Sequence, residues 1–159
     1  VLGKVVEGLV RNAVENTPDG GRVDIYVRKG EKGPELTVKD NGIGISRENQ
    51  RLIFENYFTA YETMQYSTRQ PYDFKAGGKG FDLLRMKIFS ERYNFKIRMT
   101  SQPCKFVDTK GHACPGNVED CTPLADVKDC HNSGGTTVTV QFYPAERFTK
   151  RLPSDKKQK

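Results

Sequence analysis

The sequence predicts an α+β domain, because helical and strand periodicities occur in turn along one chain of 159 residues. Apolar residues recur every three or four positions over 1–16, which is typical of one face of a helix. Residues 22–28 instead alternate apolar and polar side chains, with Val23, Ile25 and Val27 on the face expected to be buried. The chain returns at 36–39 after a turn at 29–34, which predicts an antiparallel hairpin.

The rest of the chain continues this alternation. Ser46 is a candidate N-cap for a helix that runs into the aromatic cluster ending at Phe58. Residues 59–76 lose all periodicity, and we expect a lid that is poorly ordered without ligand. A helix is predicted over 81–93, with strands at 95–99 and 136–143. Residues 102–133 contain four cysteines and three prolines, a composition that indicates an insertion.

The positive charge is concentrated at the end of the chain. The net charge is +6, and residues 145–159 hold six basic and two acidic side chains. We expect this tail to be solvated or disordered, and we expect no nucleic-acid partner, since no basic patch with interleaved aromatic residues occurs in the body. No apolar run approaches the roughly 18 residues of a membrane span, and we expect no signal peptide. Because the chain starts without Met inside a predicted helix, we expect a fragment.

The stretch Asp40-Asn41-Gly42-Ile43-Gly44-Ile45 is the first candidate for a binding site. A strand brings the Asp40 carboxylate to its end, and Gly42 and Gly44 let another group approach the backbone closely. This arrangement could accept hydrogen bonds from an exocyclic amine such as that of adenine. Asp-Asn-Gly is also common turn material, so an Asx turn that closes a hairpin is the alternative interpretation.

Two further candidates carry polar or glycine-rich patterns. Asn12 and Asn16 lie four residues apart on one helical stripe, where their amide oxygens could face a metal or phosphate; solvent exposure is the alternative. Gly78, Lys79 and Gly80 belong to a glycine loop that opens the helix at 81–93. Free N–H groups and the helix dipole make such a loop an anion site, and a flexible hinge is the alternative. The spacing of a P-loop is absent.

Five segments in order then resemble the catalytic and ATP-binding domain of sensor histidine kinases, in the superfamily that includes gyrase B, Hsp90 and MutL. Residues 9–13 with 17–21 resemble its N box, 40–45 its first glycine box, 53–58 its F box, 77–80 its second glycine box and 135–137 its third. The match covers residues 1 to about 100 and 134–144. It implies one domain over 1–144, a two-layer α/β sandwich with a mixed, mainly antiparallel sheet and about three helices.

The resemblance also implies roles for the candidate residues. Asp40 would bind the adenine amino group with support from Thr136, and Asn12 would hold Mg²⁺ against the phosphates of ATP. Gly78, Lys79 and Gly80 would cradle phosphate. The remaining ATP-binding residues would be the lid anchors Tyr57 and Phe58, together with Asn16, Gly42, Gly44, Ile45 and Phe81.

By the same resemblance, the domain transfers the γ-phosphoryl group of ATP to a histidine in a dimerisation helix upstream of residue 1. This implies a homodimeric parent chain, a response regulator downstream and a cytoplasmic location, with membrane anchoring of the parent open. Neither His112 nor His131 lies in a helical dimerisation pattern. The alternative is an ATP-hydrolysing or nucleotide-sensing domain of the same superfamily.

Two positions and the insertion at 102–133 depart from the family pattern, and position 8 separates the branches of the superfamily. Glu15 lies three residues after Asn12, the asparagine of the N box, where the family often has Lys or Arg. Its negative charge would repel a triphosphate unless it helps to hold Mg²⁺ or points away. Asp82 replaces the last glycine of the second glycine box. Gly8 stands where ATP-hydrolysing relatives place the Glu that activates water, which favours phosphoryl transfer to another group.

Four cysteines lie within the predicted insertion, at Cys104, Cys114, Cys121 and Cys130. Nine, six and eight residues separate them, with no Cys-x2-Cys knuckle, so the spacing alone is a weak zinc signal. Free thiols in a flexible loop, a zinc site with thiolate and His112 ligands, and disulfides all remain open. If the insertion is ordered, we expect at least two of the cysteines to be cross-linked by metal or disulfide, because its low apolar content cannot offset the entropy of ordering.

Overall fold

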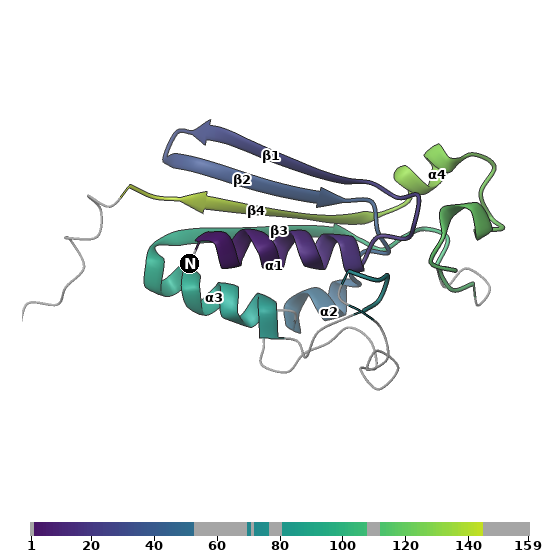
Figure 1. Ribbon diagram of the computed structural model, residues 1–159, viewed down its shortest axis with the longest axis horizontal. Helices are drawn as coiled ribbons and strands as arrows, with labels where there is room; N and C mark the ends of the chain where they lie inside the picture. The colour runs from purple at the N-terminus through teal and green to yellow at the C-terminus, as the bar shows by residue number, and fades with distance from the viewer. Residues whose placement is uncertain (1, 53–69, 71, 77–80, 108–111, 145–159) are drawn as a thin grey trace, which may run out of the picture.

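A computed structural model describes residues 2–52, 70, 72–76, 81–107 and 112–144 of the chain (Figure 1). The helices and strands predicted within these ranges are present, and residues 53–58 of the second predicted helix lie outside the described residues. In chain order they are α1 (Leu2–Glu15), β1 (Val23–Gly30), β2 (Gly33–Asp40), α2 (Arg47–Leu52), α3 (Phe81–Tyr93), β3 (Phe95–Gln102), the 3₁₀ turn η3 (Val118–Asp120), α4 (Val127–His131) and β4 (Gly135–Phe142).

The four strands form one sheet in the order β1-β2-β4-β3. All three pairings are antiparallel, and the β1–β2 hairpin is closed by a two-residue turn between Gly30 and Gly33. The last strand of the chain, β4, therefore lies in the interior of the sheet. Its pairing sets Lys39 opposite Thr137, so Asp40 at the end of β2 lies beside the start of β4.

The core lies between the sheet and the helices. Helices α1, α2 and α3 lie on the same side of the sheet (Figure 1). The spacing of apolar residues in α1 places one stripe toward the sheet, while its other face holds exposed charged residues such as Lys4 and Glu7. The buried residues of this layer come from five elements and are Val5, Leu9, Ala13, Leu36, Val38, Met86, Phe95 and Val140. The predicted two-layer α+β fold is confirmed.

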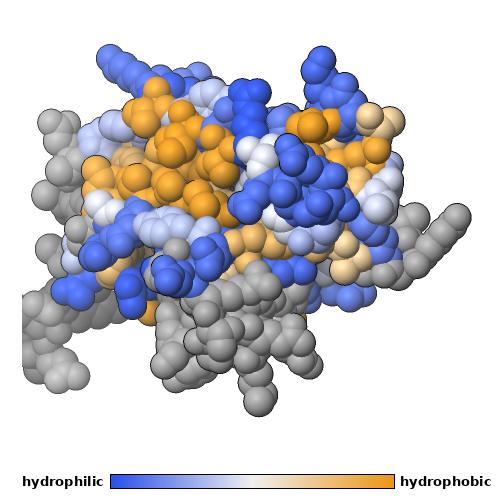
Figure 2. All heavy atoms as spheres, turned by 45° about the vertical axis from the view of Figure 1, so that its right-hand side comes forward, coloured by the Kyte–Doolittle hydropathy of each residue, from blue (hydrophilic) through white to orange (hydrophobic). Residues whose placement is uncertain are grey.

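The predicted burial of β1 is wrong for two of its residues. Ile25 is 50% exposed and Val27 is 75% exposed, although both lie on the face expected to be buried. The cause is topological, because β1 is an edge strand and the helix layer packs against the strands inward of it. Figure 2 shows apolar residues gathered on part of the molecular surface.

Two local features follow from short sequence signals. Ser46 Oγ accepts a hydrogen bond from Asn49 N at 3.2 Å, which confirms Ser46 as the N-cap of α2. The insertion contains two short helical pieces, η3 and α4, and the latter begins with a capping box between Asp126 and Asp129. Among the described residues, none of the helices combines the length and apolar character that a membrane crossing requires.

Candidate functional site

Asp40 is the buried acidic residue at the centre of the candidate site. Its side chain is 6% exposed at the end of β2. Oδ1 accepts hydrogen bonds from Gly42 N at 2.9 Å and from Thr136 N at 3.0 Å. Burial raises the pKa of Asp40 from its ordinary value of 3.8 to about 6, and the two N–H donors limit that rise. Both hydrogen bonds end on Oδ1, which leaves Oδ2 as the oxygen that could accept from a ligand amine.

The Asx turn is part of this arrangement and does not compete with it. The bond from Gly42 N to Asp40 Oδ1 is the Asx turn itself. It does not close a hairpin, because the chain runs on into α2 and the second partner of Asp40, Thr136, comes from β4. The carboxylate therefore joins three segments of the chain, and β2 positions it.

The glycines after Asp40 are required by close backbone approaches. A Cβ on Gly42 would lie 2.0 Å from Asn16 O, and one on Gly44 would lie 2.0 Å from Gln102 O. Gly44 also has a φ of +68°, a conformation that residues with a Cβ adopt at a cost. The loop is held by Ile43, whose N donates to Asn16 O at 3.0 Å and whose O accepts from Cys104 N at 2.9 Å. Residues 40–45 are thus clasped between the end of α1 and the end of β3.

Ser101 supports this loop, and the sequence analysis missed it. Its Oγ accepts from Ile45 N at 2.8 Å, bonds to the Thr136 hydroxyl at 2.8 Å, and donates to Gly135 O at 3.1 Å. Gln50 adds to the support, because its Nε2 donates to both Ile45 O and Ser101 O. The polar residues that follow position 99 could have indicated Ser101, because β3 extends to Gln102 instead of ending at 99.

We expect Ser101→Ala to lower the free energy of unfolding by about 2 kcal/mol, since it leaves partly buried backbone groups of the loop without their partner. Ser90→Ala is the matched control, because the Ser90 hydroxyl bonds only the carbonyl of Lys87 on the exposed side of α3. Urea denaturation of both variants measures the difference. Equal midpoints for Ser101→Ala and the unaltered protein would show that Ser101 does not support the loop.

The end of α1 presents the two candidate asparagines. Asn12 is half-buried in the last turns of the helix, and no described residue bonds its side-chain amide. Asn16 directs its Nδ2 back to Asn12 O at 2.7 Å, which satisfies a carbonyl of the last turn. Asn16 thus acts first as a cap, and Asn12 is the residue with a side-chain oxygen available to a ligand.

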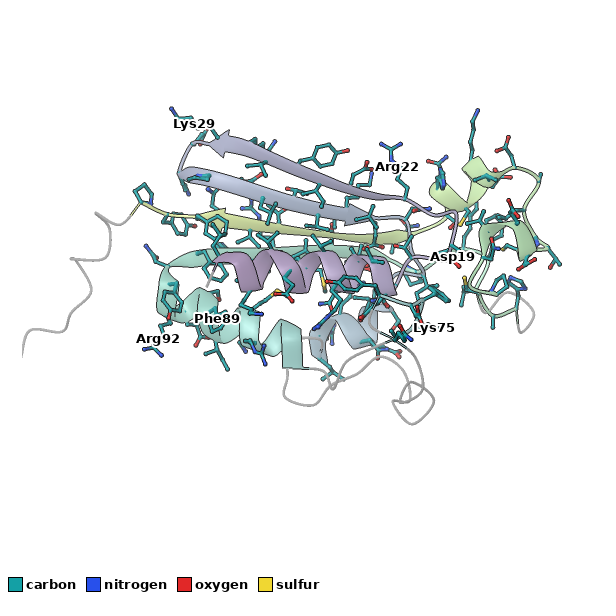
Figure 3. All side chains as sticks on the ribbon, in the orientation of Figure 1. Asp19, Arg22, Lys29, Lys75, Phe89 and Arg92 are labelled. Atoms are coloured by element: carbon teal, nitrogen blue, oxygen red, sulfur yellow. The ribbon has the colours of Figure 1, made fainter. Side chains whose placement is uncertain are left out.

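Glu15 is occupied by contacts within the protein. Its side chain is 6% exposed, lies 3.8 Å from Arg11 Nε, and accepts from Tyr72 N at 3.3 Å. Its backbone O accepts from Lys75 N at 2.6 Å. Glu15 therefore fixes the last residues of the predicted lid, 72–76, to the end of α1. Lys75, at this same end of the molecule, is labelled in Figure 3.

Part of the predicted site lies outside the described residues. This holds for Tyr57, Phe58, Gly78, Lys79 and Gly80, for most of the predicted lid, and for the side chains of Phe81 and Asp82. The phosphate-binding role of the glycine loop stays a prediction. Ile45 lies within the described residues. Its backbone N and O are both hydrogen-bonded, to the side chains of Ser101 and Gln50.

The protein family of this chain is shown by its match to a family model. A family model described as histidine kinase-, DNA gyrase B-, and HSP90-like ATPase matches residues 1–147. The chain belongs to this ATPase family. The resemblance recognised from the five boxes is therefore confirmed, and the segments that carry Asn12, Asp40 and Thr136 all lie within the matched range.

Curated relatives of this ATPase domain are sensor histidine kinases. The chain is 33% identical over 103 residues to the sensor-like histidine kinase SenX3 of Mycolicibacterium smegmatis, covering 65% of this chain and 25% of the relative. It is 31% identical over 100 residues to the sensor histidine kinase RppB of Synechocystis, covering 63% and 20%. The chain thus spans about a quarter or less of the length of these relatives.

Solved structures support the fold. The structure titled mycobacterial sensor histidine kinase MprB superposes with a TM-score of 0.54 at 22% identity, covering 88% of this chain and 68% of that one. The catalytic domain of the histidine kinase ThkA superposes with a TM-score of 0.52 at 18% identity, covering 89% and 66%. At these identities the comparison concerns the fold alone.

Proposed function

We propose that this domain binds Mg-ATP and transfers the γ-phosphoryl group to a histidine in a helical segment of the same parent protein. The observation that carries the proposal is the buried Asp40 carboxylate, held through Oδ1 by N–H groups of two different segments. An acceptor oxygen in a dry, fixed position beside a glycine turn fits a purine amino group. A hydroxyl or amide at that position would not provide a charged acceptor.

The residues of α1 and the loop after β2 have distinct tasks in this proposal. Asp40 orients the adenine, and the loop of Gly42 and Gly44 keeps the backbone close enough for the base to lie against it. Asn12 would hold Mg²⁺, which when bound neutralises phosphate charge. The half-buried Asn12 amide, bonded to no described residue, fits that task. The glycine loop at 77–80 would receive the phosphates at the start of α3.

The acceptor is proposed to be histidine and not water, on the strength of Gly8. This residue is buried in α1 one turn before Asn12 and offers no side chain that could activate a water molecule. The curated relatives are named sensor histidine kinases. With that acceptor we also propose a homodimeric parent chain, a response regulator as the downstream partner and a cytoplasmic location for the domain.

Incubation of the parent protein with ATP labelled on the γ-phosphate tests the function. We expect label on the protein that is stable to alkali and labile to acid, the signature of phosphohistidine, and none from ATP labelled on the α-phosphate. The Asp40→Asn variant should lose the label. Release of free phosphate at the same rate with no protein-bound label would instead favour the hydrolysing alternative, and no binding of ATP would contradict both.

A further inference from the structure

The cysteine-containing insertion is an ordered part of the domain in its described residues, 102–107 and 112–133. Asp19, in the turn after α1, donates through N to Gly116 O and accepts through O from Val118 N, both at 2.8 Å. Val118 is buried, and Cys104 N bonds Ile43 O. Figure 3 labels Asp19 at the end of the molecule where the insertion lies. These described residues of the insertion are thus hydrogen-bonded to the turn after α1 and to the loop after β2.

The insertion brings its cysteines to one place. A small cavity of about 20 Å³ is lined by all four thiols, by His112, and by a few apolar side chains including Val107 and Val118. The sulfurs come from four points of the chain, since Cys104 follows β3, Cys121 follows η3, Cys130 lies on α4, and Cys114 lies between the first two. A cavity of this volume can hold a single atom or ion.

Two side-chain contacts of the cysteines lie around this cavity. Cys121 Sγ lies 3.7 Å from His112 Nε2, and Cys104 Sγ lies 3.1 Å from Ser133 Oγ. Lys75 lies close enough to Cys114 for the charges of the two side chains to interact. All four cysteines are free thiols, so the disulfide alternative is not realised in this structure.

We propose that Cys104, Cys114, Cys121 and Cys130 bind one structural zinc ion, with His112 as a hydrogen-bond donor to the sulfur of Cys121. Thiolates are the ligands that zinc prefers in closed, four-coordinate structural sites, and ligand side chains in such sites are held by hydrogen bonds from a second layer of residues. Binding releases the thiol protons to solvent. Lys75 offsets part of the negative charge of the four-thiolate site.

Zinc binding would require the four cysteine sulfurs to move into coordinating positions around the ion. Within the described residues, no three His, Cys, Asp or Glu side chains are already arranged as ligands of one metal ion. We propose that the cysteine side chains rotate about their Cα–Cβ bonds to bring the sulfurs onto the ion. The closing contact would also satisfy the expectation that an insertion with few apolar residues needs a cross-link.

The site would link two loops of the nucleotide pocket. The insertion bonds the turn after α1 at Asp19 and the glycine loop at Ile43, and these two segments flank Asn16 and Asp40. Loss of the ion should therefore loosen the insertion and weaken nucleotide binding as well. This consequence rests on the proposed ATP-binding function, whereas the metal content of the protein does not.

Metal analysis of the native chain, purified under reducing conditions without chelator, tests the site directly. We expect about one zinc per chain, thiols that react with a disulfide reagent only after the metal is chelated, and thiolate charge-transfer absorption when Co²⁺ replaces zinc. Four freely reactive thiols and no uptake of added Zn²⁺ or Co²⁺ by a folded chain would overturn the proposal. Disulfides in the freshly purified protein, with no metal uptake, would also overturn it.

Variants identify the ligands. Cys121→Ser and Cys130→Ser should each lower bound zinc severalfold, while His131→Gln is the matched control because His131 bonds Gly20 O outside the cavity. His112→Gln should keep the zinc and the Co²⁺ absorption. Loss of metal from His112→Gln would overturn the four-cysteine ligand set, and unchanged zinc in both Cys→Ser variants would overturn the site. ATP titration with and without chelator separates the metal proposal from the nucleotide proposal.

Discussion

Asp40→Asn is expected to lower affinity for ATP about 10- to 100-fold, because a hydrogen bond to a charged group contributes about 1.5–3 kcal/mol. The same change should raise the free energy of unfolding at pH 7 by up to about 3 kcal/mol. The pKa of Asp40 is raised from 3.8 to about 6 by burial, and about 1.4 kcal/mol corresponds to each pKa unit. Asparagine keeps the acceptor for Gly42 N and Thr136 N without the buried charge.

The pH dependence follows from the direction of that shift. Below pH 3.8 Asp40 is protonated in both states, so it adds no penalty. As the pH rises from 3.8 toward 6, the unfolded chain gives up this proton more readily than the folded one, and the contribution of Asp40 to stability falls. The stability gain of Asp40→Asn should therefore appear across this window and be complete above pH 6. ATP affinity of the unaltered protein should decline as the pH falls below 6.

Calorimetric ATP titration and urea denaturation at several pH values measure both effects. Asp24→Asn is the matched control, because Asp24 lies on the same sheet but pairs at the surface with Arg22. An unchanged ATP affinity in Asp40→Asn would remove Asp40 from the nucleotide site. A loss of stability at pH 7 would show that its carboxylate is not an unfavourable buried charge.

Gly44→Ala is expected to destabilise the domain by about 3 kcal/mol or more, since a methyl group meets a backbone that cannot easily move. The new Cβ would lie 2.0 Å from Gln102 O, and the φ of +68° adds the strain of a left-handed conformation. Gly44 lies in the loop that follows Asp40, so the affinity for ATP should fall along with the stability of the domain.

Gly3→Ala is the control for this substitution. Nothing lies within 4 Å of a Cβ on Gly3, and alanine is favoured over glycine in helices by up to about 1 kcal/mol. Chemical denaturation should show a large loss for Gly44→Ala and no loss for Gly3→Ala. Two variants of equal stability would contradict the close packing of the glycine loop against β3.

The sequence predicted what depends on neighbouring residues. The α1 stripe, the hairpin, the Ser46 cap and the position of Asp40 at a strand end are all local patterns, and each is present. Ile25 and Val27 are exposed although they alternate with polar residues. Alternation identifies the two faces of a strand but does not show whether that strand lies at the edge of a sheet. That information is in the strand order.

Long-range contacts account for the other differences. Ser101 was missed because its value comes from Ile45 and Thr136, which lie far away in the chain. The insertion looked irregular because its order comes from bonds to Asp19 and Ile43 and not from its own periodicity. Glu15 looked like a charge that would face the phosphates, whereas its partners in 72–75 could not be read from the composition of the lid.

The interior position of β4 affects how the domain folds during its synthesis. The hydrogen bond from Thr136 N to Asp40 spans 96 residues, and it forms only when β4 pairs with β2. Contacts at such separation require costly loop closure, so domains that depend on them fold slowly. During synthesis the β1–β2 hairpin and α1 leave the ribosome long before β4. The proposed nucleotide site is therefore completed late, and a nascent chain that ends before Gly135 holds Asp40 without its second donor.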